Sequence, residues 1–255
     1  MKHMYFLVFF LVALSVGAQN NAIAAGERLT YTASYNMSGI LTNIAEVTME
    51  TSAIKTSKAT LLRLKCTAAT YSKWDHFFKI RDLYESYVNP NTLTPYLYKR
   101  DINEGNYYKF VQYTFSHKTN TVKSIQRKRN NQEQKNDVSI KPDTKDIVST
   151  LYGIRLFDFK NMTIGTHKSL NILFDREEVK AQITFLGKET ISTAIGNKLC
   201  YKLAIYTSDD VLKGGTKSNL VWLTADDNKI IVYGKFNIPV GNGELKIKSA
   251  TGLKN

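Results

Sequence analysis

The chain has 255 residues and a net charge of +13, from 35 lysines and arginines against 22 aspartates and glutamates. Its 43% hydrophobic and 11% aromatic content excludes a disordered protein, and 14 glycines with 2 cysteines exclude a collagen-like or disulfide-rich scaffold. The positive charge either favours anionic partners or only keeps the protein soluble.

The N-terminal segment, Met1 to Ala18, is predicted to be a signal peptide. Lys2 is followed by the apolar run Met4 to Val16, which is too short to span a bilayer and typical of a secretory signal. Small residues before Ala18 offer a cleavage site, and Ala22 to Ala24 offer a second. The alternatives are a buried helix or an uncleaved anchor. No cysteine follows the run, so we expect an exported, periplasmic protein that is neither a lipoprotein nor transmembrane.

Alternation of apolar and polar residues predicts β-strands through the first half of the remaining chain. Leu29 and Tyr31 alternate with Thr30 and Thr32, for example, as expected of a strand with one buried face. The predicted strands are residues 29–37, 45–50, 62–68, 77–88, 93–100, 107–116 and 121–129.

One helix interrupts this pattern. Apolar residues recur at helical spacing from Thr144 to Lys160, and Asp143 or Thr144 is the expected N-cap. Strands then return at residues 179–185, 199–205, 220–223, 230–236 and 245–248. No Pro/Gly/Ser-rich linker divides the chain, so residues 19–255 are predicted to form a single β-rich domain. Roughly a dozen strands must curl or split to stay soluble, and one apolar helix could fill the hollow.

The two cysteines leave two interpretations open. Export permits a disulfide between Cys66 and Cys200. Cys66 shares the apolar face of its strand, whereas Cys200 shares a face with Lys202, and opposed faces make a bridge harder to form. The other interpretation is a buried, structural Cys66.

Catalytic motifs are missing from the sequence. It has no Gly-x-Ser-x-Gly, no His-Glu-x-x-His and no phosphate-binding glycine loop. The histidines lack the spacing of zinc ligands, and Trp74-Asp75-His76 is interpreted as an ordinary segment. Asp226-Asp227-Asn228 suits a hairpin turn better than a calcium loop. We therefore expect a protein that is not an enzyme and has no cofactor and no metal.

A dense polar and aromatic segment provides the candidate binding residues. In a strand, Arg81, Glu85 and Tyr87 share one face, and Asp82 and Tyr84 share the other. The charged residues here either brace adjacent strands as an ion-pair network or line a polar mouth that holds a ligand. The candidate binding residues are Arg81, Asp82, Tyr84, Glu85, Tyr87, Arg100, Glu104 and Trp222.

A cationic run, Arg127-Lys128-Arg129, lies on a predicted hairpin. Such a run is either a solvated surface or a docking site for anionic lipid or glycan.

Several strings together resemble one bacterial envelope family. They are Phe78–Tyr87, Thr92–Pro95, Arg100, Glu104–Tyr107, Asp146–Arg155, Leu186–Glu189, Gly196–Cys200 and Val221–Asn228. They resemble the periplasmic family called domain of unknown function 3108. That resemblance implies a mainly β (α+β) fold, in which a curled antiparallel sheet forms an incomplete β-barrel around one main α-helix, similar to the periplasmic carriers of lipoproteins. It implies no activity and no catalytic residue.

Three functions follow as hypotheses. The first is a carrier whose apolar groove, partly plugged by the helix, holds a lipid-like or acylated envelope component. The second is an envelope module that binds a protein or an anionic polysaccharide through Arg127, Lys128 and Arg129. The third is a hydrolase with a polar cleft around Arg81, Asp82, Glu85 and Glu104. Export makes nucleic acid an unexpected partner.

Overall fold

The computed structural model describes residues 20–37, 39–129, 132–208, 219–238 and 241–255. The predicted signal peptide, Met1 to Ala18, lies outside the described residues. Fourteen strands are found in the described part of the chain. They are β1 (Arg28–Met37), β2 (Ile40–Lys55), β3 (Thr60–Thr70), β4 (Arg81–Val88), β5 (Pro95–Glu104), β6 (Tyr107–Ser116), β7 (Thr121–Lys128), β8 (Gln134–Ser139), β9 (His167–Phe174), β10 (Glu177–Thr193), β11 (Gly196–Thr207), β12 (Leu220–Thr224), β13 (Ile231–Ile238) and β14 (Gly241–Thr251).

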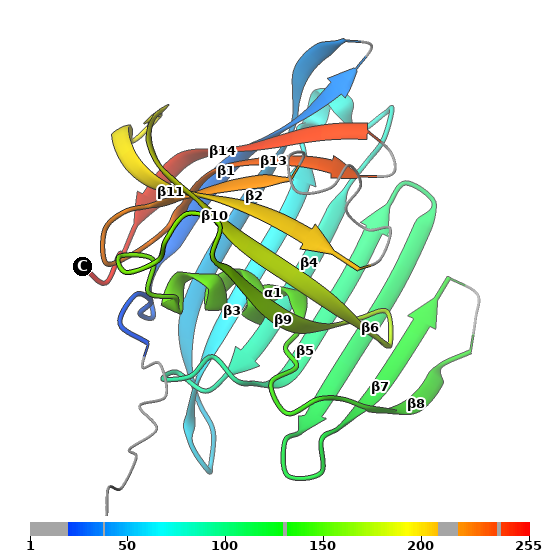
Figure 1. The fold of residues 1–255 in the computed structure, drawn as a ribbon. Coiled ribbons are helices and arrows are strands. Elements are labelled where there is room, and N and C mark those ends of the chain that lie inside the picture. The colour runs from blue at the N-terminus through cyan, green and yellow to red at the C-terminus, as the bar shows by residue number, and fades with distance from the viewer. Residues whose placement is uncertain (1–19, 38, 130–131, 209–218, 239–240) are drawn as a thin grey trace, which may run out of the picture.

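All fourteen strands belong to one antiparallel sheet in the order β8-β7-β6-β5-β4-β3-β2-β1-β14-β13-β12-β11-β10-β9. The first and last strands pair at its centre, with Tyr31 opposite Ile247. The two edges are therefore β8 and β9, which follow each other in the chain. In Figure 1 the sheet curls so that β9 and β10 pass in front of β3 to β6, and α1 lies between the two halves. The mainly β, curled and unclosed sheet expected from the sequence is confirmed.

The helical segment is shorter than predicted. The α-helix α1 spans Ile147–Gly153 and continues as a 3-10 turn, η2 (Ile154–Leu156), whereas Thr144 to Lys160 was expected; a second 3-10 turn, η1, spans Ser72–Trp74. Lys145 is extended because its backbone bridges β9 in parallel, with its N–H 3.0 Å from the Asn171 oxygen. The helix can begin only after this bridge, so the N-cap is Asp146 and not Asp143 or Thr144.

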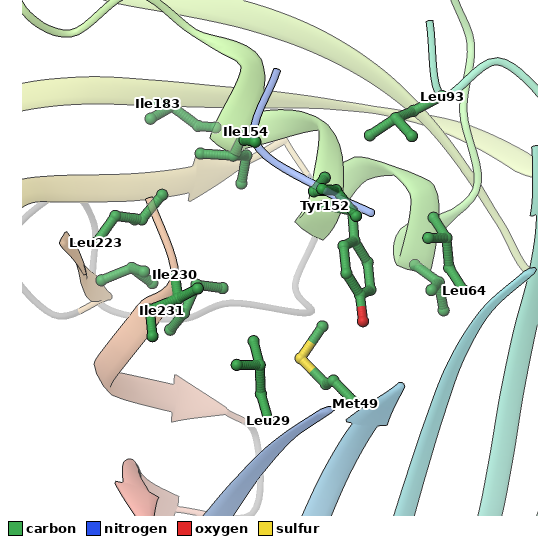
Figure 2. Packing of buried hydrophobic residues seen from close by; sticks show 14 of the residues in the cluster. Leu29, Met49, Leu64, Leu93, Tyr152, Ile154, Ile183, Leu223, Ile230 and Ile231 are labelled. Atoms are coloured by element: carbon green, nitrogen blue, oxygen red, sulfur yellow. The ribbon is translucent and has the colours of Figure 1, made fainter. Parts of the chain in front are cut away.

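The core lies between α1 and the concave face of the sheet. Figure 2 shows Tyr152 and Ile154 of the helical segment beside Leu29, Met49 and Leu64 of the first three strands. From the opposite half of the sheet come Ile183, Leu223 and Ile231, and Ile230 lies in the turn just before β13. Burial of this apolar surface is the main force that holds the helix in the curled sheet.

Two buried polar contacts fix the helical segment in place. Asp146 accepts hydrogen bonds from the Ser149 backbone N–H at 2.8 Å and from the Ser86 hydroxyl at 2.6 Å, which joins the helix start to β4. Burial raises the pKa of Asp146. Arg155 forms a two-pronged ion pair with Glu27, with N–O distances of 2.6 and 2.7 Å, and both side chains are buried.

Cys66 and Cys200 are both free thiols. Cys66 lies opposite Met49 on the concave face and is partly rather than fully buried, while Cys200 is buried. Burial raises the pKa of Cys66 to about 12 and that of Cys200 to about 11. The structure therefore has no disulfide between Cys66 and Cys200.

Candidate functional site

Strand β4 divides the predicted binding residues between the two faces of the sheet. Ser86 contacts the helix cap Asp146, so its face of β4 is the concave one. Asp82 and Tyr84 lie on this same face by alternation, and Asp82 is buried. The other predicted residues of β4, which are Arg81, Glu85 and Tyr87, therefore lie on the convex face. The charged candidates Arg81 and Glu85 are therefore separated by the sheet from Asp82, and the single ion-pair network predicted for them is not formed.

Strand β5 adds the remaining concave residues. Arg100 lies directly opposite Tyr84, and Glu104 follows Arg100 on the same face of the strand. Arg100 is buried and Glu104 is half-buried. We call Asp82, Tyr84, Arg100 and Glu104 the inner-face cluster.

The two carboxyl groups of the inner-face cluster interact directly. Glu104 donates a hydrogen bond to Asp82, which also accepts from the Asn103 backbone N–H at 2.9 Å. Burial raises the pKa of both Asp82 and Glu104, although the nearby Arg100 lowers each. Burial also raises the pKa of the Tyr84 hydroxyl, whose oxygen lies 3.5 Å from Asp82. The carboxyl pair therefore retains a proton at a pH where separate carboxyls are ionised.

Residues that the sequence analysis missed complete this side of the sheet. The carboxylate of Asp175, in the β9–β10 turn, pairs with both Arg100 and Lys109, and lies 2.7 Å from the Lys109 Nζ. The Arg100 guanidinium lies over the Phe174 ring, 4.7 Å from its centroid. The ion pairs lower the pKa of Asp175 in spite of its partial burial. In the sequence Asp175 indicates only a turn, and nothing there connects it to a strand 75 residues earlier.

The convex residues of β4 form two separate surface pairs. The two terminal nitrogens of the Arg81 guanidinium donate to the two carboxylate oxygens of Asp75, at 3.0 and 2.5 Å. Glu85 lies 3.6 Å from Arg63 and accepts a hydrogen bond from Tyr87 at 3.4 Å. The Arg63–Glu85 pair connects β3 to β4. The Arg81–Asp75 pair joins β4 to the residue after η1 and, being partly exposed, contributes little stability.

Trp222 also lies on the convex face, because the adjacent Leu223 faces the core in Figure 2. Its ring stacks on Tyr233, with centroids 4.8 Å apart, and its indole N–H bonds Glu189. Lys202 lies over the indole at 5.4 Å. Trp222 is buried, so it supports the neighbouring surface but is not itself open to a ligand.

A groove of about 510 Å³ lies next to this aromatic pair. It runs between the tip of the β10–β11 hairpin and the convex face of β13, β14 and β1. Its lining includes the apolar residues Ile191 and Ala194, together with Tyr233, Lys246 and Lys248. Lys246 pairs with Glu244 at 2.9 Å and Lys248 with Glu46 at 2.8 Å, and both lysines are more than half exposed. We call this the hairpin groove.

Apolar side chains of the core pack against the helical segment. Besides the hairpin groove, described residues line a pocket of about 210 Å³ near Arg155 and Phe157, and one of about 310 Å³ near Lys58 and Tyr96. None of these three pockets is lined by α1. The apolar groove expected beside the helix therefore does not appear among them.

The predicted cationic patch is split between the two faces. Arg127 lies 4.7 Å over the Phe110 ring and 3.9 Å from Glu133. Lys128 is exposed on the other face and lies directly opposite Lys109. Arg129 is exposed after the end of β7. The three cations thus do not form one surface.

No described helix is long and apolar enough to cross a membrane. Within the described ranges, no group of three or more histidine, cysteine, aspartate or glutamate side chains is arranged to hold a metal ion.

These features define a class: an unclosed, barrel-like antiparallel sheet with one short helix in its hollow and ligand-sized space on its surface. Residues 30–248 match the family model described as "Protein of unknown function (DUF3108)", and the chain belongs to that family. None of the curated proteins matches the chain.

Two solved structures resemble this chain over most of its length. A "beta-barrel-like" protein of the domain of unknown function DUF1849, from Brucella abortus, is 8% identical with a TM-score of 0.59, over 89% of this chain and 97% of that one. A candidate exported protein with a YmcC-like fold from Bacteroides fragilis is 9% identical with a TM-score of 0.37, over 89% of this chain and 96% of that one. The first likeness shows the shared fold; the second is too distant to support an argument.

Proposed function

We propose that this protein is an exported, non-catalytic binding protein of the cell envelope that holds an anionic amphiphile in the hairpin groove. The observation that carries this proposal is the groove itself, whose volume of about 510 Å³ lies in the range of small-molecule sites. The N-terminal sequence pattern supports export.

The lining of the hairpin groove favours a ligand with two different ends. Ile191, Ala194 and the Tyr233 ring offer apolar surface. Lys246 and Lys248 offer exposed ammonium groups that can turn from their glutamate partners towards an acidic head group. This assignment keeps the lipid-like ligand predicted from the sequence, but moves it from the concave face to the convex face.

Binding rather than catalysis is favoured by the arrangement of the ionisable groups. The hydrolase hypothesis requires a cleft that joins Arg81 and Glu85 to Asp82 and Glu104, and the structure separates them by the thickness of the sheet. The two lysines of the hairpin groove are each paired with a glutamate, and no histidine or cysteine is among the residues that line it.

A fluorescent fatty acid, 11-(dansylamino)undecanoic acid, tests the proposal because it has an anionic head and an alkyl chain. The wild-type protein should bind it saturably. Ile191→Asp places a charge against the alkyl chain, and Lys248→Glu repels the head group, so each should weaken binding about tenfold.

Lys58→Glu is the matched control, since it makes the same charge change in the pocket near Tyr96. It should leave the affinity unchanged. The proposal fails if the wild type shows no saturable binding, or if Lys58→Glu weakens binding as much as Lys248→Glu does.

A further inference from the structure

A second concentration of charge lies on the concave face, away from the hairpin groove. Arg100 on β5 and Lys109 on β6 are buried, and Lys128 on β7 is directly opposite Lys109. Arg176 adds a fourth cation from the β9–β10 turn. The carboxylate of Asp175 is the acid that pairs with Arg100 and Lys109.

Positive charge exceeds negative charge at this place. Besides Asp175, the acids near Arg100 are Asp82 and Glu104, so three carboxyls stand against the four cations named above. No carboxylate in the described part of the chain forms an ion pair with Lys128. Like charges directly opposite in a sheet are destabilising, so the juxtaposition of Lys109 and Lys128 favours an additional anion.

Arg100 has further hydrogen-bonding capacity. Its Nε is buried and has no hydrogen-bond partner, and its side chain is only 5% exposed. Phe174 covers the Arg100 guanidinium and Asp175 forms an ion pair with it. Two consecutive residues at the β9–β10 turn therefore shield this guanidinium. The Asp175 side chain itself is 42% exposed, so solvent reaches this side chain.

The covering turn is held by polar contacts. Its two residues, Asp175 and Arg176, have φ of 47° and 74°, a conformation that favours Asn-Gly and is costly for arginine. The Arg176 backbone N–H donates to the Tyr113 hydroxyl at 3.0 Å, and its guanidinium lies 3.2 Å from Asn136 of the edge strand β8. Exchanging these two hydrogen bonds of Arg176 for hydrogen bonds to water or to a ligand costs little free energy.

We propose that Arg100, Lys109 and Lys128 form an oxyanion site for the carboxylate or phosphate group of a ligand, and that Asp175 occupies this site as an internal substitute. A ligand anion replaces the Asp175 carboxylate on Arg100 and Lys109, recruits Lys128, and releases the β9–β10 turn from the concave face. The site is separate from the hairpin groove, so the two proposals succeed or fail independently.

The first test measures binding of sodium phosphate and of sodium acetate by calorimetry, against sodium chloride at equal ionic strength. Asp175→Asn removes the internal competitor, so the variant should bind at least one of the two anions about tenfold more tightly than the wild type. The preferred anion identifies the ligand group. Adding Lys109→Gln and Lys128→Gln should abolish the gain. Asp227→Asn, at an exposed pair with Lys160, is the matched control and should change nothing.

The second test uses the wild type, because Asp175→Asn leaves two buried cations unpaired and could unfold the protein. Hydrogen exchange of the Arg176 amide should be faster in phosphate or acetate than in chloride, since release of the turn breaks its bond to Tyr113. Unchanged exchange in both anions overturns the proposal, as does a gain in affinity that survives loss of Lys109 and Lys128.

Discussion

The buried ion pair between Arg155 and Glu27 is the contact whose removal should be most damaging. Besides Glu27, Arg155 donates to the Asn228 carbonyl at 2.9 Å and to the Ala22 carbonyl at 3.1 Å. One side chain thus joins η2 to the N-terminal segment and to the turn before β13. Its exposure is 2%, and that of Glu27 is 0%.

Arg155→Met should lower the free energy of unfolding by about 3–5 kcal/mol, because it leaves the Glu27 carboxylate buried and unpaired. That loss is a large part of the roughly 5–15 kcal/mol by which a domain is stable. Adding Glu27→Met should recover about 2 kcal/mol, since the double variant no longer buries a lone charge. Equilibrium urea unfolding, compared at unchanged m-value, measures both changes.

The exposed pair Lys160–Asp227, with side chains 61% and 66% exposed, provides the control. Asp227→Asn should cost less than about 1 kcal/mol. The reasoning is refuted if Arg155→Met costs no more than this control, or if the double variant is as unstable as the sum of the two single variants.

Two further predictions concern pH and processing. The pKa values of Asp82 and Glu104 are raised in the folded state, so the stability that this pair contributes should be lost as pH rises from about 4 through these pKa values. The urea midpoint of the wild type should therefore fall relative to that of Glu104→Gln between pH 4 and 8, and midpoints that stay parallel for the two proteins would contradict this. Signal cleavage should follow Ala18 and not Ala24, because Ala22 and Ile23 are buried in the core. The intact mass of the exported protein identifies its first residue, and a mature chain that begins at residue 25 would refute this prediction.

Local pattern was sufficient for much of the fold. Alternation on β4 correctly placed Asp82 and Tyr84 on one face and Arg81, Glu85 and Tyr87 on the other, because side chains alternate at every residue of any strand. The single α-helix was located from the three- and four-residue spacing of its apolar residues, which is also a local pattern. Its start was wrong, because the Lys145 bridge to β9 depends on a contact that helical periodicity does not reveal.

Which face of each strand turns inwards was decided by the curl of the whole sheet. The sequence contained the charges of Arg100 and Asp175, and of Glu27 and Arg155, but these partners lie 75 and 128 residues apart. Their meeting depends on β1 pairing with β14 and on β9 crossing to the opposite wall. Short-range periodicity specifies strands and faces, whereas long-range strand pairing brings distant charges together. For that reason only the tertiary structure showed these two ion pairs and the hairpin groove.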